Sequence, residues 1–251
     1  MPELAGKTVL ITGSGSLGGI GADTALLFAQ QGAEVLVSGR HTERGQRVVE
    51  TILQAGGTAR FLLADLANLD DVARLADEAG DVDVLVNNAA GYKLESSLKL
   101  TAEDFSLMYD TIVRAAFFLV QKLAPRMVAR RSGSIVNVSS TAASVALPGG
   151  MSLYGSAKAA MDSLTRYWAA EFAEGNVRVN AVAVGPTSTD NVTAAMKSLG
   201  PGVIEGMAAS IPLGRWASPR EISQIILFLA SERSSFATGG VFAADGGTVA
   251  V

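Results

Sequence analysis

The sequence predicts an α/β protein built on a single Rossmann-type, doubly wound parallel sheet of about seven strands with helices on both faces. Three observations predict this fold. Strand-like and helix-like segments alternate along nearly the whole chain, the strand-like segments are short uninterrupted apolar runs, and a glycine-rich stretch follows the first of them. Uninterrupted apolar runs indicate strands that are covered on both faces, and βα alternation indicates that these strands run parallel.

The first half of the chain contributes four strands and the helices between them. Thr8–Ile11 is an apolar run that glycines end, and helical apolar spacing follows until Gly32 stops it. The same unit recurs, with Gly56 closing the second helix. The expected strands are Thr8–Ile11, Glu34–Ser38, Ala59–Ala64 and Val82–Val86, and the expected helices are Asp23–Gln31, Glu43–Gln54 and Asp71–Ala79.

The second half continues the alternation with longer helices. A long helical segment is expected from about Thr101 to Arg130, with a bend at Pro125, because proline removes a helical hydrogen bond. The remaining expected strands are Ser134–Val138, Val177–Ala183 and Gly240–Ala244, and the remaining expected helices are Leu153–Ala173 and Pro219–Ala230.

A chain of 251 residues without a linker-like stretch is expected to form one dinucleotide-binding domain over residues 1–251. Within it, residues 190–213 are a helical excursion that glycine and proline interrupt. Two interpretations stay open for this segment: a mobile apolar lid over a substrate, or an ordinary amphipathic core helix. Its apolar residues are Met196, Leu199, Val203, Ile204, Met207 and Ile211.

Composition restricts the partners of the protein. The net charge of -4 and the pI near 5.1 argue against a nucleic-acid partner, which usually requires a basic face. The apolar runs are far shorter than the roughly 20 residues of a membrane span, and the N-terminus has no signal-peptide pattern, so a cytoplasmic protein is expected. Because the chain has no cysteine and His41 is its single histidine, no metal site is expected.

The segment TGSGSLGGIG follows the first expected strand and opens the first helix. One interpretation is G-x-G-x-x-G on Gly13, Gly15 and Gly18. The other is a longer loop that Gly19 and Gly21 close. Both place backbone N–H groups around a phosphate, and both need glycine because a Cβ would block the tight turn and the approach of the backbone to a pyrophosphate. We therefore expect a dinucleotide at this turn.

The end of the second strand bears on the choice of nucleotide. This strand ends in Val37-Ser38-Gly39-Arg40. An NAD site usually has Asp or Glu there to bind the ribose 2′-hydroxyl, whereas a missing acid with a neighbouring arginine suits a 2′-phosphate. The sequence therefore favours NADP(H) over NAD(H). The alternative for Arg40 is a solvated turn residue.

The glycine loop, with Gly32-Ala33 eleven residues beyond Gly21, resembles the T-G-x-x-x-G-x-G fingerprint of the classical short-chain dehydrogenase/reductase family. The resemblance makes Gly13, Gly19 and Gly21 the fingerprint glycines and leaves two extra residues in the loop. Two site residues have structural alternatives, since Asp65 could cap a helix and Asn88 could join neighbouring loops. The expected cofactor-binding residues are Gly13, Ser14, Gly15, Gly19, Ile20, Gly21, Arg40, Asp65, Leu66, Asn88, Ala89, Tyr154, Lys158, Gly185, Thr187 and Thr189.

The pattern Tyr154-Gly155-Ser156-Ala157-Lys158 begins a predicted helix, so the phenol and the ammonium group share one face. A carbonyl that accepts hydride on carbon must gain a proton on oxygen, which a free tyrosine, with a pKa of about 10, supplies and recovers slowly near neutral pH. Lys158 is expected to lower the pKa of Tyr154 by about two to three units, or roughly 3 to 4 kcal/mol. The resemblance implies that Ser140 holds the substrate oxygen and that Lys158 also binds the nicotinamide ribose. A strand-end cap is the alternative for Ser140.

The family pattern also exposes one departure. Ile112 stands where an asparagine normally supports a proton-relay water, and isoleucine can neither donate nor accept a hydrogen bond. Two hypotheses follow: the relay takes another route, with Thr111 contributing, or turnover is weak.

These features predict an NADP(H)-dependent carbonyl reductase or alcohol dehydrogenase with Tyr154 as general acid and base and Ser140 and Lys158 beside it. The expected substrate is an apolar carbonyl compound or alcohol, with Tyr92 and Leu147 lining its pocket. The C-terminal part resembles the 3-oxoacyl carrier-protein reductase-like branch of the family, which implies a homotetramer. The alternative function is a nucleotide-binding sensor without useful catalysis.

Overall fold

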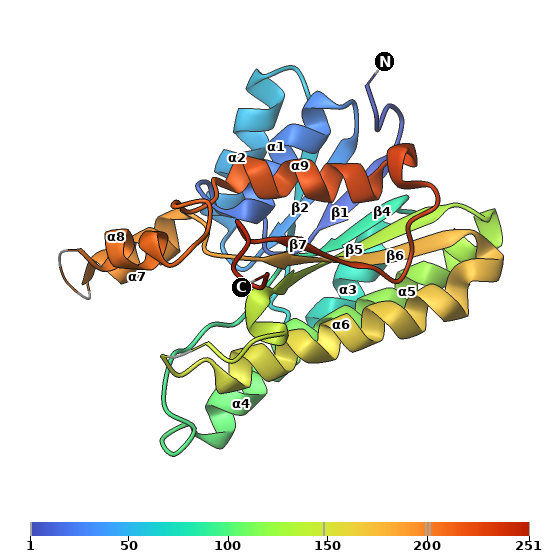
Figure 1. Cartoon of the computed structure of the whole chain (residues 1–251). Coiled ribbons are helices and arrows are strands. Elements are labelled where there is room, and N and C mark those ends of the chain that lie inside the picture. The colour runs from blue at the N-terminus through green and yellow to red at the C-terminus, as the bar shows by residue number, and fades with distance from the viewer. Residues whose placement is uncertain (1, 148, 199, 201, 251) are drawn as a thin grey trace.

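The computed structural model describes residues 2–147, 149–198, 200 and 202–250 (Figure 1). The strands are β1 (Thr8–Ile11), β2 (Glu34–Gly39), β3 (Thr58–Leu63), β4 (Val84–Asn87), β5 (Gly133–Ser140), β6 (Val177–Val184) and β7 (Val241–Ala244). The helices are α1 (Ile20–Gln30), α2 (Thr42–Gln54), α3 (Leu69–Ala79), α4 (Ala102–Tyr109), α5 (Ala115–Arg130), α6 (Ser152–Phe172), α7 (Asp190–Ser198), α8 (Val203–Ala209) and α9 (Pro219–Ala230).

The strands of this part of the chain form one seven-stranded sheet in the order β3-β2-β1-β4-β5-β6-β7, and every pair is parallel. In Figure 1, α1, α2 and α9 lie on one face of the sheet and α3, α5 and α6 on the other. This confirms the predicted Rossmann-type fold. The strand order reverses between β1 and β4, so the loops that follow these two strands meet at the point where doubly wound sheets bind ligands.

Two hydrophobic cores fill the space between the sheet and its helices. Successive side chains of a strand point to opposite faces, so Leu10 of β1 belongs to the core under α3, α5 and α6, whereas Val9 and Ile11 belong to the core under α1 and α9. Phe28 of α1 has no exposed surface in the second core. The apolar strands therefore carry hydrophobic contacts on both faces, as their uninterrupted sequence predicts.

The long helix differs from its prediction. A π-helical turn at Asp110–Arg114 separates α4 from α5, and Pro125 lies inside a continuous α5. A π turn accommodates one extra residue per turn, and here an Asp110–Arg114 ion pair of 2.9 Å spans it. Arg114 also donates to the Ala67 carbonyl, at 2.8 Å. The break is thus fixed by the packing of Ile112 and by contacts to the β3–α3 connection, and not by the proline.

The helix pair α7–α8 projects from the layered body in Figure 1. It has a small hydrophobic cluster of its own around Met196, Ile211 and Trp216. Leu199, which the lid prediction includes, lies outside the described residues. Among the described helices, none is both long enough and apolar enough to span a membrane.

Candidate active site

The glycine-rich turn after β1 has little room for side chains. Gly13 has a φ of 66°, and a Cβ on it would lie 2.7 Å from the Ala89 Cα. A Cβ on Gly21 would lie 2.5 Å from the Asn88 Nδ2. Gly18 has a φ of 76°, whereas a Cβ on Gly19 would meet nothing closer than 3.6 Å. The steric and conformational need for glycine therefore falls on residues 13, 18 and 21. Gly13 and Gly18 are exposed, so this cradle leaves backbone open to the approach of a pyrophosphate.

The polar groups of Ser14 are hydrogen-bonded within the protein, unlike those expected of a phosphate ligand. Its hydroxyl donates to the Ile11 carbonyl at 2.7 Å and accepts from the Ser38 N–H at 3.1 Å, and its N–H donates to the Ser38 carbonyl at 3.0 Å. Ser14 is fully buried. Its donors are thus used to join the ends of β1 and β2, so they are not available to a phosphate.

Asn88 joins the loops that follow β4 and β1. Its Nδ2 donates to the Thr12 carbonyl at 2.9 Å and to the Gly13 carbonyl at 3.0 Å. The Thr12 hydroxyl accepts in return from the N–H groups of Asn88 and Ala89. The structural alternative for Asn88 is therefore realised, and it bears directly on the cofactor site because it fixes Gly13.

Three of the expected cofactor-binding residues follow β2 and β3 at the same edge of the sheet. Arg40 follows β2 and is exposed, and no ion pair joins it to another described residue. Asp65 follows β3, where its carboxylate accepts from the Ala67 N–H at 3.1 Å and its N–H donates to Asp71. Leu66 is buried. Asn68, and not Asp65, caps α3.

Ser140, Tyr154 and Lys158 converge at the carboxyl end of β5. Ser140 is the last residue of β5, and its hydroxyl accepts from the Ala142 N–H at 3.2 Å, so the capping alternative is also realised. Tyr154 and Lys158 lie one turn apart on α6. The Lys158 Nζ is 5.6 Å from the centroid of the Tyr154 ring and donates to the Val138 carbonyl at 2.6 Å. The local pattern thus places a phenol, a hydroxyl and an ammonium group together.

The pKa of Tyr154 moves in the direction opposite to the prediction. Burial raises the pKa of Tyr154 to about 12, and the Ser140 hydroxyl opposes this only in part. Lys158 does not offset the burial, because it is itself 2% exposed, and burial lowers its pKa to about 8. The expectation of a lowered tyrosine pKa is therefore wrong for the protein's own residues. Desolvation of the phenolate outweighs the attraction of a lysine that is bound to a carbonyl oxygen.

Two further buried residues bear on the chemistry of the site, Ile112 and Asp162. Ile112 is 3% exposed and packs in the hydrophobic core on the α6 side of the sheet, so it offers no hydrogen bond there. Asp162 lies one turn beyond Lys158 on α6 and is 6% exposed. Burial raises the pKa of Asp162, while the Ser139 hydroxyl, Arg166 and Lys158 lower it. Its Oδ1 has no hydrogen-bond partner among the described residues. Sequence reasoning missed Asp162, although the spacing of four residues from Lys158 is a usable signal.

The loop after β6 closes the other side of the site. A Cβ on Gly185 would lie 2.6 Å from the Asp245 Cα. Thr187 is buried, and its hydroxyl donates to the Gly185 carbonyl at 3.0 Å. Thr189 accepts from the Val192 N–H at the start of α7. These expected cofactor residues therefore lie at the base of the α7–α8 pair.

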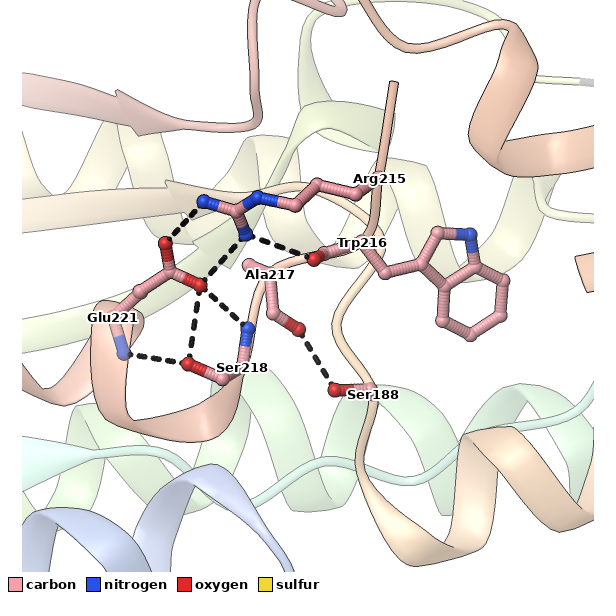
Figure 2. Close-up of polar contacts among 6 residues, drawn as sticks. All are labelled: Ser188, Arg215, Trp216, Ala217, Ser218 and Glu221. Carbon is pink, nitrogen blue, oxygen red and sulfur yellow. Dashed lines mark hydrogen bonds and ion pairs between the residues drawn. The ribbon is translucent and has the colours of Figure 1, made fainter. Parts of the chain in front are cut away.

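Both ends of the α7–α8 excursion are fixed at one place, which Figure 2 shows. The Ser188 hydroxyl donates to the Ala217 carbonyl at 3.0 Å, and Arg215 forms two hydrogen bonds with Glu221, at 2.7 and 2.9 Å. Glu221 completes a capping box with Ser218 at the start of α9, and these contacts lower the pKa of Glu221 to about 2. The Trp216 ring points away from the ion pair (Figure 2) and packs in the cluster of the excursion.

The excursion also touches the glycine loop. The Asp190 N–H donates to the Gly18 carbonyl at 3.1 Å, and a Cβ on Gly18 would overlap the Asp190 carboxylate. This contact involves the part of the loop that is longer than the family fingerprint. Sequence reasoning did not find it, because nothing local links a glycine loop to an acidic residue so far along the chain.

A cavity of about 520 Å³ lies along the loop between Ser140 and α6. Leu147 lines it, whereas Tyr92 does not. Its wall mixes the serines Ser97, Ser144, Ser152 and Ser156 with small aliphatic residues. The three predicted catalytic residues do not line this cavity, which lies along the N-terminal turns of α6.

Tyr92 lies beside the predicted acid. Its ring packs edge to face against that of Tyr154, with 5.3 Å between centroids, and 49% of its surface is exposed. Tyr92 thus belongs to the reacting end of the site, and not to the cavity farther along α6.

Comparison with known proteins agrees with this arrangement. The family model described as enoyl-(acyl carrier protein) reductase matches residues 13–249. The 3-oxoacyl-[acyl-carrier-protein] reductase of Thermotoga maritima is 36% identical over 251 residues, which are 98% of this chain and 99% of that protein. A solved short chain dehydrogenase/reductase family protein is 47% identical, with a TM-score of 0.91 over 99% of this chain and 100% of that chain. The L-sorbose reductase of Gluconobacter frateurii, complexed with NADPH and L-sorbose, is 29% identical, with a TM-score of 0.94 over both chains in full. The chain belongs to the short-chain dehydrogenase/reductase family, in the branch similar to 3-oxoacyl-[acyl-carrier-protein] reductases.

Proposed function

We propose that the protein is an NADP(H)-dependent oxidoreductase that transfers hydride between the nicotinamide and a carbonyl compound or secondary alcohol, with Tyr154 as the general acid and base. The observation that carries the proposal is the convergence of Ser140, Tyr154 and Lys158 at the same sheet edge as the glycine cradle. Family membership supports it, and so does the NADPH bound to the similar L-sorbose reductase.

The residues divide the chemistry in a simple way. When bound, NADPH supplies the hydride for the carbonyl carbon. Tyr154, whose pKa of about 12 keeps it protonated at neutral pH, donates its proton to the carbonyl oxygen. Ser140 shares the charge that develops on that oxygen, and Lys158 holds a positive charge behind the phenol.

The cofactor cradle would hold the pyrophosphate on the backbone of Gly13, Gly15, Gly19 and Ile20, at the start of α1. Arg40 supports NADP(H), because its guanidinium is exposed and has no acidic partner among the described residues. Replacing Arg40 by Asp is the direct test. A fall in NADPH affinity with a gain for NADH supports the assignment, and unchanged selectivity argues against it.

The substrate is a small carbonyl compound, and the cavity walls suggest that it is not purely apolar. Serine hydroxyls and small aliphatic groups share the surface beside α6. We propose that the α7–α8 pair acts as a lid, because it has its own hydrophobic cluster and is fixed to the body at its base. The single domain over residues 1–251 and this lid at about 190–213 form one functional unit.

A homotetramer is also proposed. Most of the apolar run from Ala115 to Val120 is buried inside the protomer, and Phe117 is 41% exposed. Phe105 and Leu107 of α4 add exposed apolar surface beside the site. Sedimentation of the purified protein tests this state.

Oxidation of NADPH in the presence of a panel of ketones tests the function. Turnover by the wild type together with a loss of at least a hundredfold in Tyr154→Phe is expected, because phenylalanine keeps the ring and removes the proton. Binding of NADPH without turnover of any ketone would instead support the sensor alternative, which no comparison favours.

A further inference from the structure

Tyr92 lies against Tyr154, but the roles proposed for Ser140, Tyr154 and Lys158 leave it without a function. It lies just after β4, in the segment that Asn88 ties to the glycine loop. The backbone before it is also confined, since a Cβ on Gly91 would lie 3.2 Å from the Leu107 carbonyl oxygen. Tyr92 is therefore presented from a fixed segment of the switch point.

The contact between the two tyrosines is specific in geometry. Their ring planes are 86° apart and their centroids are separated by 5.3 Å, which is a T-shaped arrangement. Such a pair contributes about 0.5–1.5 kcal/mol beyond the area that it buries. The Tyr92 ring thus restricts the orientation of the Tyr154 ring, while about half of Tyr92 stays accessible to a ligand.

The hydroxyl of Tyr92 is available for recognition. No hydrogen bond joins it to another described residue, whereas the Tyr109 hydroxyl donates to Ser156. Partial burial raises the pKa of Tyr92, so the phenol is neutral and can both donate and accept. An ionised Tyr92 would raise the pKa of Tyr154, so the two phenols lie close enough to influence each other.

We propose that Tyr92 is a specificity-determining residue that hydrogen-bonds an oxygen substituent on the carbon next to the reacting carbonyl. The preferred substrates are then hydroxy ketones and related compounds with two neighbouring oxygens, in place of the purely apolar ketones that composition suggested. The proposal rests on the proposed function, because it assigns the reacting oxygen to Tyr154. A site that hydrogen-bonds a substrate hydroxyl discriminates strongly against the analogue without it, since its polar group is then left unpaired.

The test compares two ketones of one carbon skeleton, 3-hydroxy-2-butanone and 2-butanone, with NADPH as reductant. We expect wild-type kcat/KM to be at least tenfold higher for the hydroxy ketone. Tyr92→Phe keeps the ring contact and removes the hydroxyl, so the ratio should move close to one, mainly through KM for the hydroxy ketone. Tyr92→Leu removes the ring as well, and kcat should fall about two- to tenfold for both ketones as Tyr154 loses its edge contact.

The matched control is Tyr167→Phe, which removes a phenol hydroxyl from a side chain that is 72% exposed on α6. This variant should keep the wild-type ratio. Thermal unfolding of each variant verifies that it is folded. A wild-type ratio near one, or a Tyr92→Phe ratio equal to that of the wild type, overturns the role of Tyr92 while leaving the proposed function intact. No turnover of either ketone by an enzyme that reduces other ketones of the panel also overturns the role of Tyr92 alone. No turnover of any ketone, or retained turnover in Tyr154→Phe, overturns both.

Discussion

Replacing Lys158 by methionine should stabilise the fold at neutral pH while abolishing turnover. The ammonium group is 2% exposed, and its pKa is lowered from 10.5 to about 8. Below pH 8 the lysine is charged in both the folded and the unfolded chain, and its burial then costs about 3 kcal/mol at roughly 1.4 kcal/mol per pKa unit. Methionine has a similar unbranched shape and carries no charge.

Two interactions oppose this gain, one of them the attraction between Lys158 and the buried Asp162 carboxylate. The Lys158 Nζ donates to the Val138 carbonyl at 2.6 Å, and methionine leaves that buried oxygen without a partner. An unpaired buried acceptor costs about 1–3 kcal/mol. The expected net change in the free energy of unfolding at pH 7 is therefore a gain of about 0–2 kcal/mol, smaller than the desolvation alone would give.

The pH dependence distinguishes this reasoning from a simple packing effect. Between pH 8 and pH 10.5 the unfolded lysine keeps its proton while the folded lysine loses it, so the wild type gains stability as the pH rises through this window. The advantage of Lys158→Met should shrink accordingly. Urea unfolding at pH 7, 8, 9 and 10 measures it, and the series stops at pH 10 because tyrosines of the unfolded chain ionise above it.

The exposed Lys122 of α5 gives the matched control. Lys122→Met should change the free energy of unfolding by no more than about 0.5 kcal/mol at any pH of the series. The reasoning is refuted if Lys158→Met is less stable than the wild type at pH 7, or if its advantage does not decline between pH 8 and pH 10.

Three other substitutions test the cofactor side of the site. Asn88→Ala removes two donated hydrogen bonds, which should lower the free energy of unfolding by about 1–2 kcal/mol. Asn88→Asp should lower it further, because a carboxylate would face the Thr12 and Gly13 carbonyls. Equal effects of the two substitutions in urea unfolding would contradict this. Gly21→Ala should weaken NADPH binding at least tenfold in fluorescence titration, since its methyl group would meet the Asn88 side chain and the Gly13 carbonyl. Unchanged NADPH affinity would argue against cofactor binding at the glycine cradle. Ile112→Asn should lower the free energy of unfolding by about 3 kcal/mol through the loss of buried apolar surface. A large rise in the kcat of the folded variant would show that the missing asparagine limits proton transfer.

Local sequence signals predicted most of the fold. The strand Thr8–Ile11 and the helix Pro219–Ala230 have the predicted boundaries, because an apolar run ended by glycine and a Ser-Pro-x-Glu start are complete within a few residues. The convergence of Ser140, Tyr154 and Lys158 was also predictable, since a strand end and the first turns of the next helix are close in any parallel βα unit.

The tertiary structure decided what depends on burial and on residues distant in the chain. Ser14 is joined to Ser38, and Tyr92 lies against Tyr154, through contacts that no local pattern encodes. The rise in the pKa of Tyr154 is the clearest example. A tyrosine side chain predicts a proton donor. The direction in which its pKa shifts depends on how completely the surrounding helices and strands exclude water, which is a property of the packed molecule.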